Sequence, residues 1–534
     1  MLKNNPFFDK IIKNTQTKHL NKHFIKLKIQ IIDKLKKKCI HLFSPNIKKM
    51  KYKQIIITII LFIFLAINIH TYVSSGNSAS RFATIEMIVE KNTFIIDNST
   101  FMGDAKMYEI KDKQNLPLMR LNNIEAINGT NDKILVKNKF YSDKTVNSAL
   151  IATPIYALLY KLGMSFSNKG ELVVFLLTLL FSTIPTIIIA IIFYKSLKFT
   201  KIPKKYEIPL SLMIILSTLL FPYGTVFNNH TLAALFISIA FYIILKNSHK
   251  EEIKKNNYFT IGLFSGLAAS IDLVAGGLFL ICSSIYFLNK TKYNLYKNKQ
   301  IFMFFILGIL PILIIHTIFT IPITGDILPG SVHPEYWKYN GSNFNENNLS
   351  GTGLKHNSIG NFFIYLFHTL LGFRGFFSYT PYLLVGIFLF FKKIYAKKTI
   401  VEMRTKKKIK IEISSFTTYK KELILWMCFS ASTIIFYAIT TNGYGGWSYG
   451  MRWFVPLIFG LYFMSSLFFE ENKLFKKNRI NMSTIIIILL IIIGIFTSVV
   501  GVIEPWTEMW KTQIPLLNNL YVIAKKLPFK LLWF

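Results

Sequence analysis

Apolar residues are gathered into long runs, and most polar and charged residues stand between those runs. A hydrocarbon core about 30 Å thick is crossed by roughly 20 helical residues, so apolar runs of about that length predict membrane-spanning helices. Eleven such runs are present, at 54–72, 171–194, 207–227, 230–245, 259–271, 272–288, 301–320, 376–391, 422–441, 451–469 and 483–503. The pattern therefore predicts an all-α polytopic membrane protein with about eleven transmembrane helices.

Two stretches depart from a simple alternation of span and loop. The segment 259–288 is short for two crossings and carries four glycines, so we interpret it as a tight hairpin with Asp272 at its outer apex. The stretch 147–163 is also apolar, but counting it as a crossing would place the lysine-rich segment after the next span outside. We interpret 147–163 as a membrane-surface or re-entrant helix that is broken at Pro154.

Basic residues are distributed unequally between the two sides of these spans. The segments on the side of the amino terminus hold 43 Lys/Arg and 10 Asp/Glu, whereas the opposite side holds 20 and 16. Because Lys and Arg are retained in cytoplasmic loops, the asymmetry predicts a cytoplasmic amino terminus and an extracytoplasmic carboxyl terminus. The resulting segments are a basic cytoplasmic tail (1–53), a first outer loop (about 73–170), a second (about 321–375), a Gly-aromatic loop (442–450) and an outer tail (504–534).

Composition excludes several classes of protein. Hydrophobic residues make up 52% of the 534 residues and charged residues 17%, which is too apolar for a soluble or disordered chain. The net charge of +37 comes mainly from Lys and Arg in the segments predicted to be cytoplasmic, where membrane topology accounts for it, so no nucleic-acid partner is predicted. Cys39, Cys282 and Cys428 lie in the basic tail and in apolar runs, which leaves no outer disulfide framework or Cys-based metal site. The first span follows 53 residues with 15 lysines and is expected to remain as a signal anchor.

The first outer loop begins with a short amphipathic segment. Apolar residues recur at helical spacing between Ser80 and Glu90, and Ser80 can cap that helix. Arg81 and Glu86 would then stand at the membrane surface, where they are well placed to meet a lipid headgroup. The alternative is that Arg81 only snorkels to phospholipid and that Glu86 lies on a solvated face.

Residues 132–144 predict a β-hairpin with its turn at Lys137-Asn138. The hairpin would carry Asp143 and Lys144 to the mouth of the re-entrant helix. A carboxylate in that reduced dielectric can act as a general base toward a hydroxyl, and a neighbouring ammonium can pair with a phosphate. The alternative is that Asp143 only caps the following helix.

These residues, in this order, resemble the first periplasmic loop of GT-C glycosyltransferases. The matching stretches are Arg81-Phe82-Ala83 with Glu86, a turn at 92–97, and Phe140-Tyr141-Ser142-Asp143-Lys144 before an apolar helix. The branch they resemble is the family 39-like one, which contains the aminoarabinose transferase of lipid A and the protein O-mannosyltransferases. The resemblance is detailed over about 81–194 and rests elsewhere on hydropathy and loop placement.

The resemblance implies a GT-C-like fold whose large first extracytoplasmic loop carries juxtamembrane helices. It also implies transfer of a sugar from a polyprenyl-phosphate donor at the outer leaflet. By the same resemblance Asp143 matches the acidic position of the family, Lys144 the lysine that meets the lipid phosphate, and Arg81 the first-loop arginine. Direct displacement at the anomeric carbon predicts inversion of its configuration.

Two departures from the family pattern affect the catalytic base. Thr145-Val146 stand where the family has Pro-Pro, and Asn77, Ser78 and Ser80 occupy the stretch where an acidic residue normally precedes the arginine. The usual first-loop carboxylate is therefore missing. Three carboxylates are left as candidates for the base: Glu86, Asp97 and Asp143.

The Gly-aromatic loop 442–450 is a second candidate for ligand binding, and it also resembles a segment of uncharacterised members of the same superfamily. Glycines allow the backbone to approach a ligand, and Tyr444, Trp447 and Tyr449 offer ring faces for the apolar side of a sugar. The alternative is an ordinary interfacial aromatic belt with tight packing.

The chain has only six arginines, and two of them flank predicted outer segments. Arg452 enters a span at the headgroup level, where a guanidinium can bind phosphate bidentately. Arg374 stands between two glycines before another span and is either a second phosphate or sugar contact or a membrane anchor.

Metal binding has weak support in the sequence. A divalent cation is the one possible cofactor, and it could be ligated by His333, Glu335 and His356. The spacing of these residues matches no recognised metal motif. The sequence also lacks a phosphate-cradling Gly-rich loop, a nucleotide-binding fingerprint and a Ser nucleophile elbow.

The predicted function is that of a glycosyltransferase of the bacterial plasma (inner) membrane. It would move a sugar from a polyprenyl-phosphate-linked donor to a lipid, glycan or protein acceptor on the extracytoplasmic face. A secondary transporter or flippase would instead need ionisable groups near the bilayer midplane, broken helices or paired repeats, whereas the charges here stand at the ends of the spans. A non-catalytic envelope assembly protein is the third alternative. It requires that every loop motif described above has only a structural role.

Overall fold

The computed structural model describes residues 47–73, 75–102, 129–248, 254–290, 295–342, 344, 355–394, 415–471, 475–476, 479–480, 482–507 and 513–526. Most of the predicted basic tail, with Cys39, lies outside these residues. The chain divides into two compact units, 1–61 and 62–534. Helix α2 (Ile47–Ile67) covers the described part of the first unit and continues into the second.

Every predicted apolar run is helical, and six described helices are long and apolar enough to cross a membrane. Beyond α2, the helices that occupy the predicted runs are α7 (Phe166–Thr178), η1 (Leu179–Thr183) and α8 (Ile184–Leu197), α9 (Lys204–Leu216) with α10 (Leu220–Tyr223), α11 (Asn229–Ser248), α12 (Lys255–Ile271), α13 (Leu273–Lys290), α14 (Leu295–Thr324), α16 (Phe376–Tyr379) with α17 (Leu383–Ile394), α19 (Lys420–Thr440), η5 (Arg452–Leu457) with α20 (Ile458–Ser466) and α21 (Phe468–Glu471), and α22 (Met482–Ile503). The predicted all-α, polytopic architecture is confirmed.

The predicted spans 207–227 and 376–391 are interrupted, although each is one apolar run in the sequence. The run 207–227 breaks after α9, where the hydroxyls of Ser217 and Thr218 donate to carbonyls one turn earlier and so satisfy backbone acceptors at the end of the helix. The run 376–391 breaks at Thr380, directly before Pro381, which has no N–H to continue a helix.

The hairpin of α12 and α13 is confirmed, with Asp272 at its apex. The backbone of Asp272 is extended, and its Oδ1 accepts the N–H of Ala275 at 3.3 Å, so the side chain caps α13. Helix α14 packs closely along α12, because a glycine of each helix lets the backbones meet.

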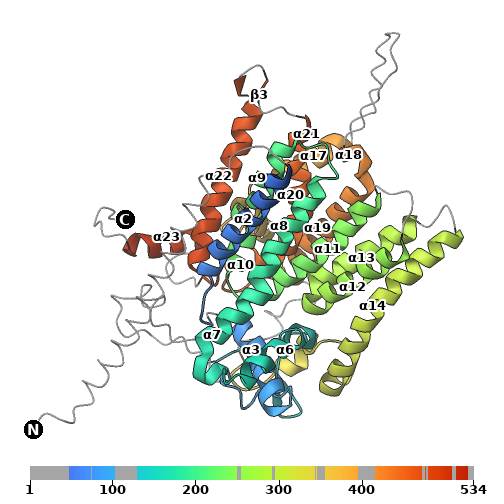
Figure 1. Ribbon diagram of the computed structural model, residues 1–534. Coiled ribbons are helices and arrows are strands. Elements are labelled where there is room, and N and C mark those ends of the chain that lie inside the picture. The colour runs from blue at the N-terminus through green and yellow to red at the C-terminus, as the bar shows by residue number, and fades with distance from the viewer. Residues whose placement is uncertain are drawn as a thin grey trace, which may run out of the picture. The chain divides into compact units, whose positions relative to one another are not determined.

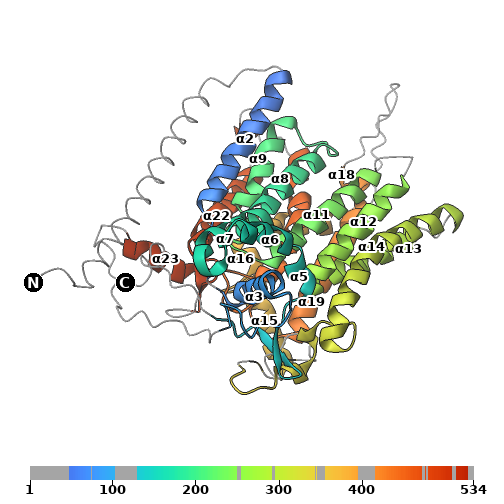
Figure 2. The same ribbon diagram turned by 60° about the horizontal axis from the view of Figure 1, so that its bottom comes forward.

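The predicted first outer loop (about 73–170) contributes a group of short elements at one end of the bundle. In Figure 1 the loop helices α3 and α6 lie at the lower end of the long helices, whereas α18 (Ser415–Thr418) and α21 lie at the upper end. Figure 2 brings the lower end forward and shows α3, α5 (Val146–Leu150) and α15 (Ile359–Leu370) there. The loop elements are α3 (Gly76–Lys91), β1 (Lys133–Val136), β2 (Lys139–Ser142), α5 (Val146–Leu150) and α6 (Thr153–Lys161).

Helix α3 begins earlier than predicted, so the cap expected at Ser80 is wrong. Ser75 caps the helix and accepts the N–H of Asn77 at 3.1 Å, which places Ser80 inside the second turn. The segment before Ser80 is drawn into the helix because it packs against the core: Ser78 is buried and donates to the carbonyl oxygen of Phe227 at 2.8 Å.

The predicted β-hairpin is confirmed, and so is the predicted break in the helical stretch 147–163. Strands β1 and β2 pair antiparallel around a two-residue turn in which Lys137 and Asn138 have φ of 49° and 61°. Helices α5 and α6 are separated at 151–152, and Pro154 lies in the first turn of α6.

Two short amphipathic helices were not predicted, because each has only 12 residues and was too short to count as a span. They are α15 (Ile359–Leu370), in the second outer loop, and α23 (Pro515–Lys526), in the carboxyl-terminal tail. The remaining elements are η3 (Gly330–Val332), η4 (Pro334–Trp337) and an antiparallel pair of β3 (Phe475–Lys476) and β4 (Arg479–Ile480).

Candidate functional site

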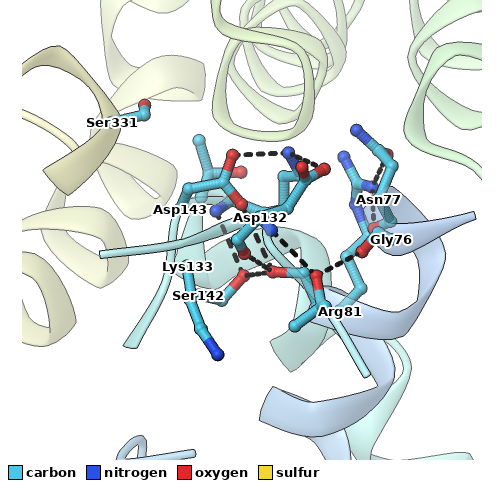
Figure 3. Close-up of polar contacts among 12 residues, drawn as sticks. Gly76, Asn77, Arg81, Asp132, Lys133, Ser142, Asp143 and Ser331 are labelled. Atoms are coloured by element: carbon cyan, nitrogen blue, oxygen red, sulfur yellow. Dashed lines mark hydrogen bonds and ion pairs between the residues drawn. The ribbon is translucent and has the colours of Figure 1, made fainter. Parts of the chain in front are cut away.

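Lys144 lies between two aspartates at the open end of the hairpin. Its Nζ is 2.9 Å from Oδ2 of Asp132 and 2.5 Å from Oδ2 of Asp143. The strand register explains the arrangement: Lys133 pairs with Ser142, so the residues just beyond them, Asp132 and Asp143, meet. The two aspartates lie close together in Figure 3, where the side chains of α3 approach them.

Helix α3 contributes a serine and an arginine to the same place. Ser80 Oγ donates to the main-chain oxygen of Asp132 at 2.5 Å and lies 3.3 Å from Oδ1 of Asp143. The Arg81 guanidinium is buried, and its Nη1 donates to the main-chain oxygen of Asn77 at 2.8 Å, whereas its Nε has no hydrogen-bond partner among the described residues. We call the group of Ser80, Arg81, Asp132, Asp143 and Lys144 the hairpin cluster.

Burial and charge shift the pKa values of the two aspartates in opposite directions. Burial raises the pKa of Asp143, and the Lys144 ammonium offsets this only in part. Burial acts in the same sense on Asp132, but Lys144, Arg452 and Arg81 outweigh it, and the pKa of Asp132 is lowered. Burial lowers the pKa of Arg81 to about 10, although Asp143 acts against that shift. Asp143 is therefore the carboxylate of the pair that binds a proton first.

The other two carboxylates proposed from the sequence hold the turn after α3. Glu86 is buried, and it accepts hydrogen bonds from Ser99 Oγ at 2.5 Å and from the N–H and hydroxyl of Thr100 at 2.9 and 2.8 Å. Burial raises the pKa of Glu86. Asp97 accepts the N–H of Phe140 at 2.9 Å and so joins the turn to the hairpin. Neither carboxylate contacts the hairpin cluster through a hydrogen bond or ion pair among the described residues.

Arg374 organises the Gly-aromatic loop. Its guanidinium is fully buried, and Nη1 donates to the carbonyl oxygens of Tyr444, at 2.9 Å, and of Gly446. The loop can turn around this side chain because Gly445 and Gly446 adopt φ of 83° and 69°. Nε and Nη2 of Arg374 have no hydrogen-bond partner among the described residues, and burial lowers the pKa of Arg374 to about 10.

Arg452 stands between the loop and the hairpin cluster. It is mostly buried, its guanidinium lies over the ring of Trp506 at 4.9 Å, and its Nε has no hydrogen-bond partner among the described residues. Its charge helps to lower the pKa of Asp132, so the loop arginine and the hairpin cluster are electrostatic neighbours. The structure thus brings Arg81, Lys144 and Arg452 into one region.

The three aromatic residues of the loop differ in exposure. Trp447 is 51% exposed, and Tyr444 is half-buried and stacked on Tyr365 with ring centroids 4.8 Å apart. Tyr449 does not offer a ring face, contrary to the sequence-based expectation. It is fully buried, and its hydroxyl donates to the carbonyl oxygen of Thr497 at 2.7 Å, because α22 closes over this part of the loop.

The candidate metal ligands are not assembled. His333 lies 3.3 Å from Oε1 of Glu335 and 3.4 Å from Oδ1 of Asp326, whereas Nε2 of His356 is 2.8 Å from the carbonyl oxygen of Ala438. In the part of the chain that the structure describes, no group of three or more His, Cys, Asp and Glu side chains could hold a metal ion.

Sequence reasoning missed two members of this region. Asp132 was placed in the hairpin, but only the strand register sets it opposite Asp143. His230, the second residue of α11, pairs with Asp272 at the apex of the α12–α13 hairpin, with Nδ1 2.6 Å from Oδ2. Nothing in the sequence joins a histidine at the start of one span to an aspartate between two others.

No family model and no curated protein matches the chain. Among solved structures, the chain is similar to ArnT from Cupriavidus metallidurans, whose crystal structure was determined bound to undecaprenyl phosphate. The identity is 8%, the match covers 89% of this chain and 76% of that chain, and the TM-score is 0.45.

Proposed function

We propose that this chain is an integral-membrane glycosyltransferase that moves a sugar from a polyprenyl-phosphate donor to an envelope acceptor on the extracytoplasmic face. The observation that carries the proposal is the hairpin cluster, in which a lysine is held between the buried carboxylate of Asp143 and the partly buried carboxylate of Asp132, beside buried guanidiniums at one end of an apolar helix bundle. Charged groups are costly to bury unless they are paired, so a concentration of them at this position favours a binding or catalytic role.

The cations of the site fit an anionic headgroup. Arg81, Arg374 and Arg452 each keep at least one buried N–H without a hydrogen-bond partner among the described residues. Phosphate oxygens accept several charge-assisted hydrogen bonds at once and would satisfy such donors. We assign binding of the donor phosphate to Lys144, Arg81 and Arg452. Arg374 holds the Gly-aromatic loop in place, and Tyr444 and the exposed Trp447 contact the sugar.

The reaction assigned to this site is a displacement at the anomeric carbon. The acceptor oxygen forms a bond to that carbon, the bond to the phosphate oxygen breaks, and polyprenyl phosphate leaves with the electron pair, which inverts the configuration. The acceptor hydroxyl must also lose a proton. Of the carboxylates suggested by the sequence, Asp143 lies in the cluster, whereas Glu86 and Asp97 are engaged in holding the loop.

The test is to incubate the purified protein with a panel of polyprenyl-phosphate sugars and to follow release of polyprenyl phosphate. We expect Lys144→Met to weaken the use of donor by roughly 10- to 100-fold, because a hydrogen bond to a charged group contributes about 1.5–3 kcal/mol. Lys139→Met is the matched control, since Lys139 lies in the same hairpin but is exposed near its turn.

A wild-type protein that releases no polyprenyl phosphate from any donor would refute the proposal. Movement of lipid-linked sugar across a vesicle membrane without any glycosidic product would favour a transporter instead.

A further inference from the structure

A buried histidine–aspartate pair lies at the same end of the bundle as the hairpin cluster. His230 and Asp272 are 5% and 4% exposed, and Nδ1 of the histidine lies 2.6 Å from Oδ2 of the aspartate. Asp272 is fixed in place, because its N–H donates to the carbonyl oxygen of Ala268 at 2.9 Å and its Oδ1 caps α13 through the N–H of Ala275. The carboxylate is therefore part of a rigid apex and holds the imidazole in one orientation.

The contact with Asp272 sets the tautomer of His230. An ionised carboxylate only accepts hydrogen bonds, so Nδ1 carries the hydrogen and Nε2 keeps its lone pair. The hydrogen bond through Nδ1 is the one that the imidazole of His230 makes among the described residues, so none of them engages Nε2. A neutral imidazole that is oriented by a carboxylate through one nitrogen and free at the other is the arrangement of a general base.

The elements that carry the hairpin cluster also pack around this pair. Ser78, one turn before Arg81 on α3, donates to the carbonyl oxygen of Phe227, three residues before His230. Helix α5, which begins two residues after Lys144, packs against α12, and η5, which begins with Arg452, packs against α11 and α13. The histidine is thus enclosed by the same loop segments to which we assign the donor phosphate.

Ionisable groups from three other elements face the pair. They are Arg81 from α3, Arg452 from η5 and the phenol of Tyr437 from α19. Asp272 contacts the imidazole directly, so its carboxylate can stabilise the imidazolium that forms when a proton is taken from a substrate.

Asp143 is less well placed for the same step once a donor is bound. Its Oδ2 is held by Lys144 and its Oδ1 lies 3.3 Å from Ser80 Oγ. When a phosphate draws Lys144 away, Asp132 and Asp143 face each other without their shared cation, and one of two adjacent carboxylates then binds a proton. His230 has no such conflict.

We propose that His230, oriented by Asp272, is the general base of the transfer reaction. Its Nε2 takes the proton of the acceptor hydroxyl as the acceptor oxygen bonds to the anomeric carbon and the bond to the donor phosphate breaks. The electron pair leaves with polyprenyl phosphate, and the proton passes from His230 to water before the next turnover. The inference rests on the proposed function and leaves Asp143 the task of placing Lys144.

The test compares single-turnover release of polyprenyl phosphate by the wild type, His230→Gln and the control His316→Gln, from mildly acidic to mildly alkaline pH. We expect His230→Gln to lower the rate about 10²–10⁴-fold at neutral pH, with donor binding unchanged, and to lose the fall in rate at acid pH that protonation of an imidazole causes. Added imidazole should restore transfer to His230→Ala, which a purely structural role does not predict. His316 contacts the carbonyl oxygen of Ile327, and its variant should match the wild type.

The outcomes separate the two proposals. Wild-type release together with an unchanged rate and acid limb in His230→Gln overturns the inference alone, whereas no release by the wild type overturns the proposed function as well. If His230→Gln no longer binds polyprenyl phosphate, Asp272→Asn replaces it: slower transfer with a shifted acid limb supports the inference, and an unchanged profile rejects it.

Discussion

At the scale of single residues, the hairpin cluster shows how burial and charge make two similar side chains different. Asp132 and Asp143 contact the same ammonium, yet the pKa of Asp132 is lowered and the pKa of Asp143 is raised. The difference arises because Arg452 and Arg81 add to the effect of Lys144 at Asp132, whereas burial dominates at Asp143. Both carboxylates hold Lys144 in place, and Asp143 is the one that binds a proton at the higher pH.

We predict that Asp143 binds a proton at a pH above the ordinary aspartate value of 3.8, and Asp132 only below it. Because the pKa of Asp143 is raised in the folded protein, proton uptake there favours the folded state, and this contribution is lost as the pH rises through the shifted value. At Asp132 the sign is reversed: its stabilising contribution is present at higher pH and is lost as the pH falls through its lowered value.

Infrared or carbon-13 titration of the aspartate carboxyls checks this order. Asp143→Asn should remove the carboxyl signal that appears first as the pH falls, and Asp132→Asn should leave a signal above the ordinary value. A first signal that persists in Asp143→Asn would show that the assignment is wrong.

At the scale of elements, a glycine contact sets the distance between α12 and α14. A Cβ at Gly262 would overlap the carbonyl oxygen of Phe305, and one at Gly308 would overlap the carbonyl oxygen of Phe259. Because hydrocarbon surfaces gain little by leaving lipid, close backbone approach through small residues is a main source of helix association inside a membrane. Helix α12 ends at Asp272, so this contact also supports the position of the catalytic pair that we propose.

We predict that Gly262→Val lowers the thermal stability of the purified protein, because the added methyl groups force the two helices apart, at a cost of about 1–3 kcal/mol. Gly277→Val is the matched control, since a Cβ at Gly277 in the neighbouring helix α13 meets nothing within 4 Å. Thermal unfolding followed by size-exclusion chromatography compares the two, and equal midpoints would contradict the packing argument.

At the scale of the whole molecule, the proposed function depends on which side of the membrane the hairpin cluster occupies. The predicted cytoplasmic segments carry a large excess of Lys and Arg, and the two ends of the helix bundle carry different loop elements in Figure 1. A polyprenyl-phosphate sugar presented at the outer leaflet can reach the cluster only if α3 and the hairpin lie outside.

We predict that a membrane-impermeant maleimide labels Asn138→Cys in intact cells, and that it labels Lys204→Cys only after the membrane is opened. Both positions are exposed, one in the hairpin turn and one at the start of α9, and the native cysteines are replaced in both variants. Labelling of Lys204→Cys in intact cells with none at Asn138→Cys would place the cluster in the cytoplasm and exclude an extracytoplasmic transferase site.

The sequence by itself determined the features that depend on neighbouring residues. The apolar runs predicted the helices because hydropathy and run length are properties of neighbouring residues. The turn at Lys137-Asn138 is local too: a two-residue hairpin loop requires positive φ, and both residues adopt it. The same reasoning placed Asp143 and Lys144 at the end of the hairpin. It also predicted the helix break next to Pro154.

Only the tertiary structure decided which distant side chains meet. Asp132 reaches the cluster through strand register, Tyr449 is enclosed because α22 covers it, and His230 finds Asp272 because the start of one helix packs against the apex of a hairpin. These contacts join residues far apart in the chain, and hydropathy treats each of their segments alike. The physical reason is that burial and pairing, which set charge and reactivity, are properties of packed neighbours rather than of sequence position.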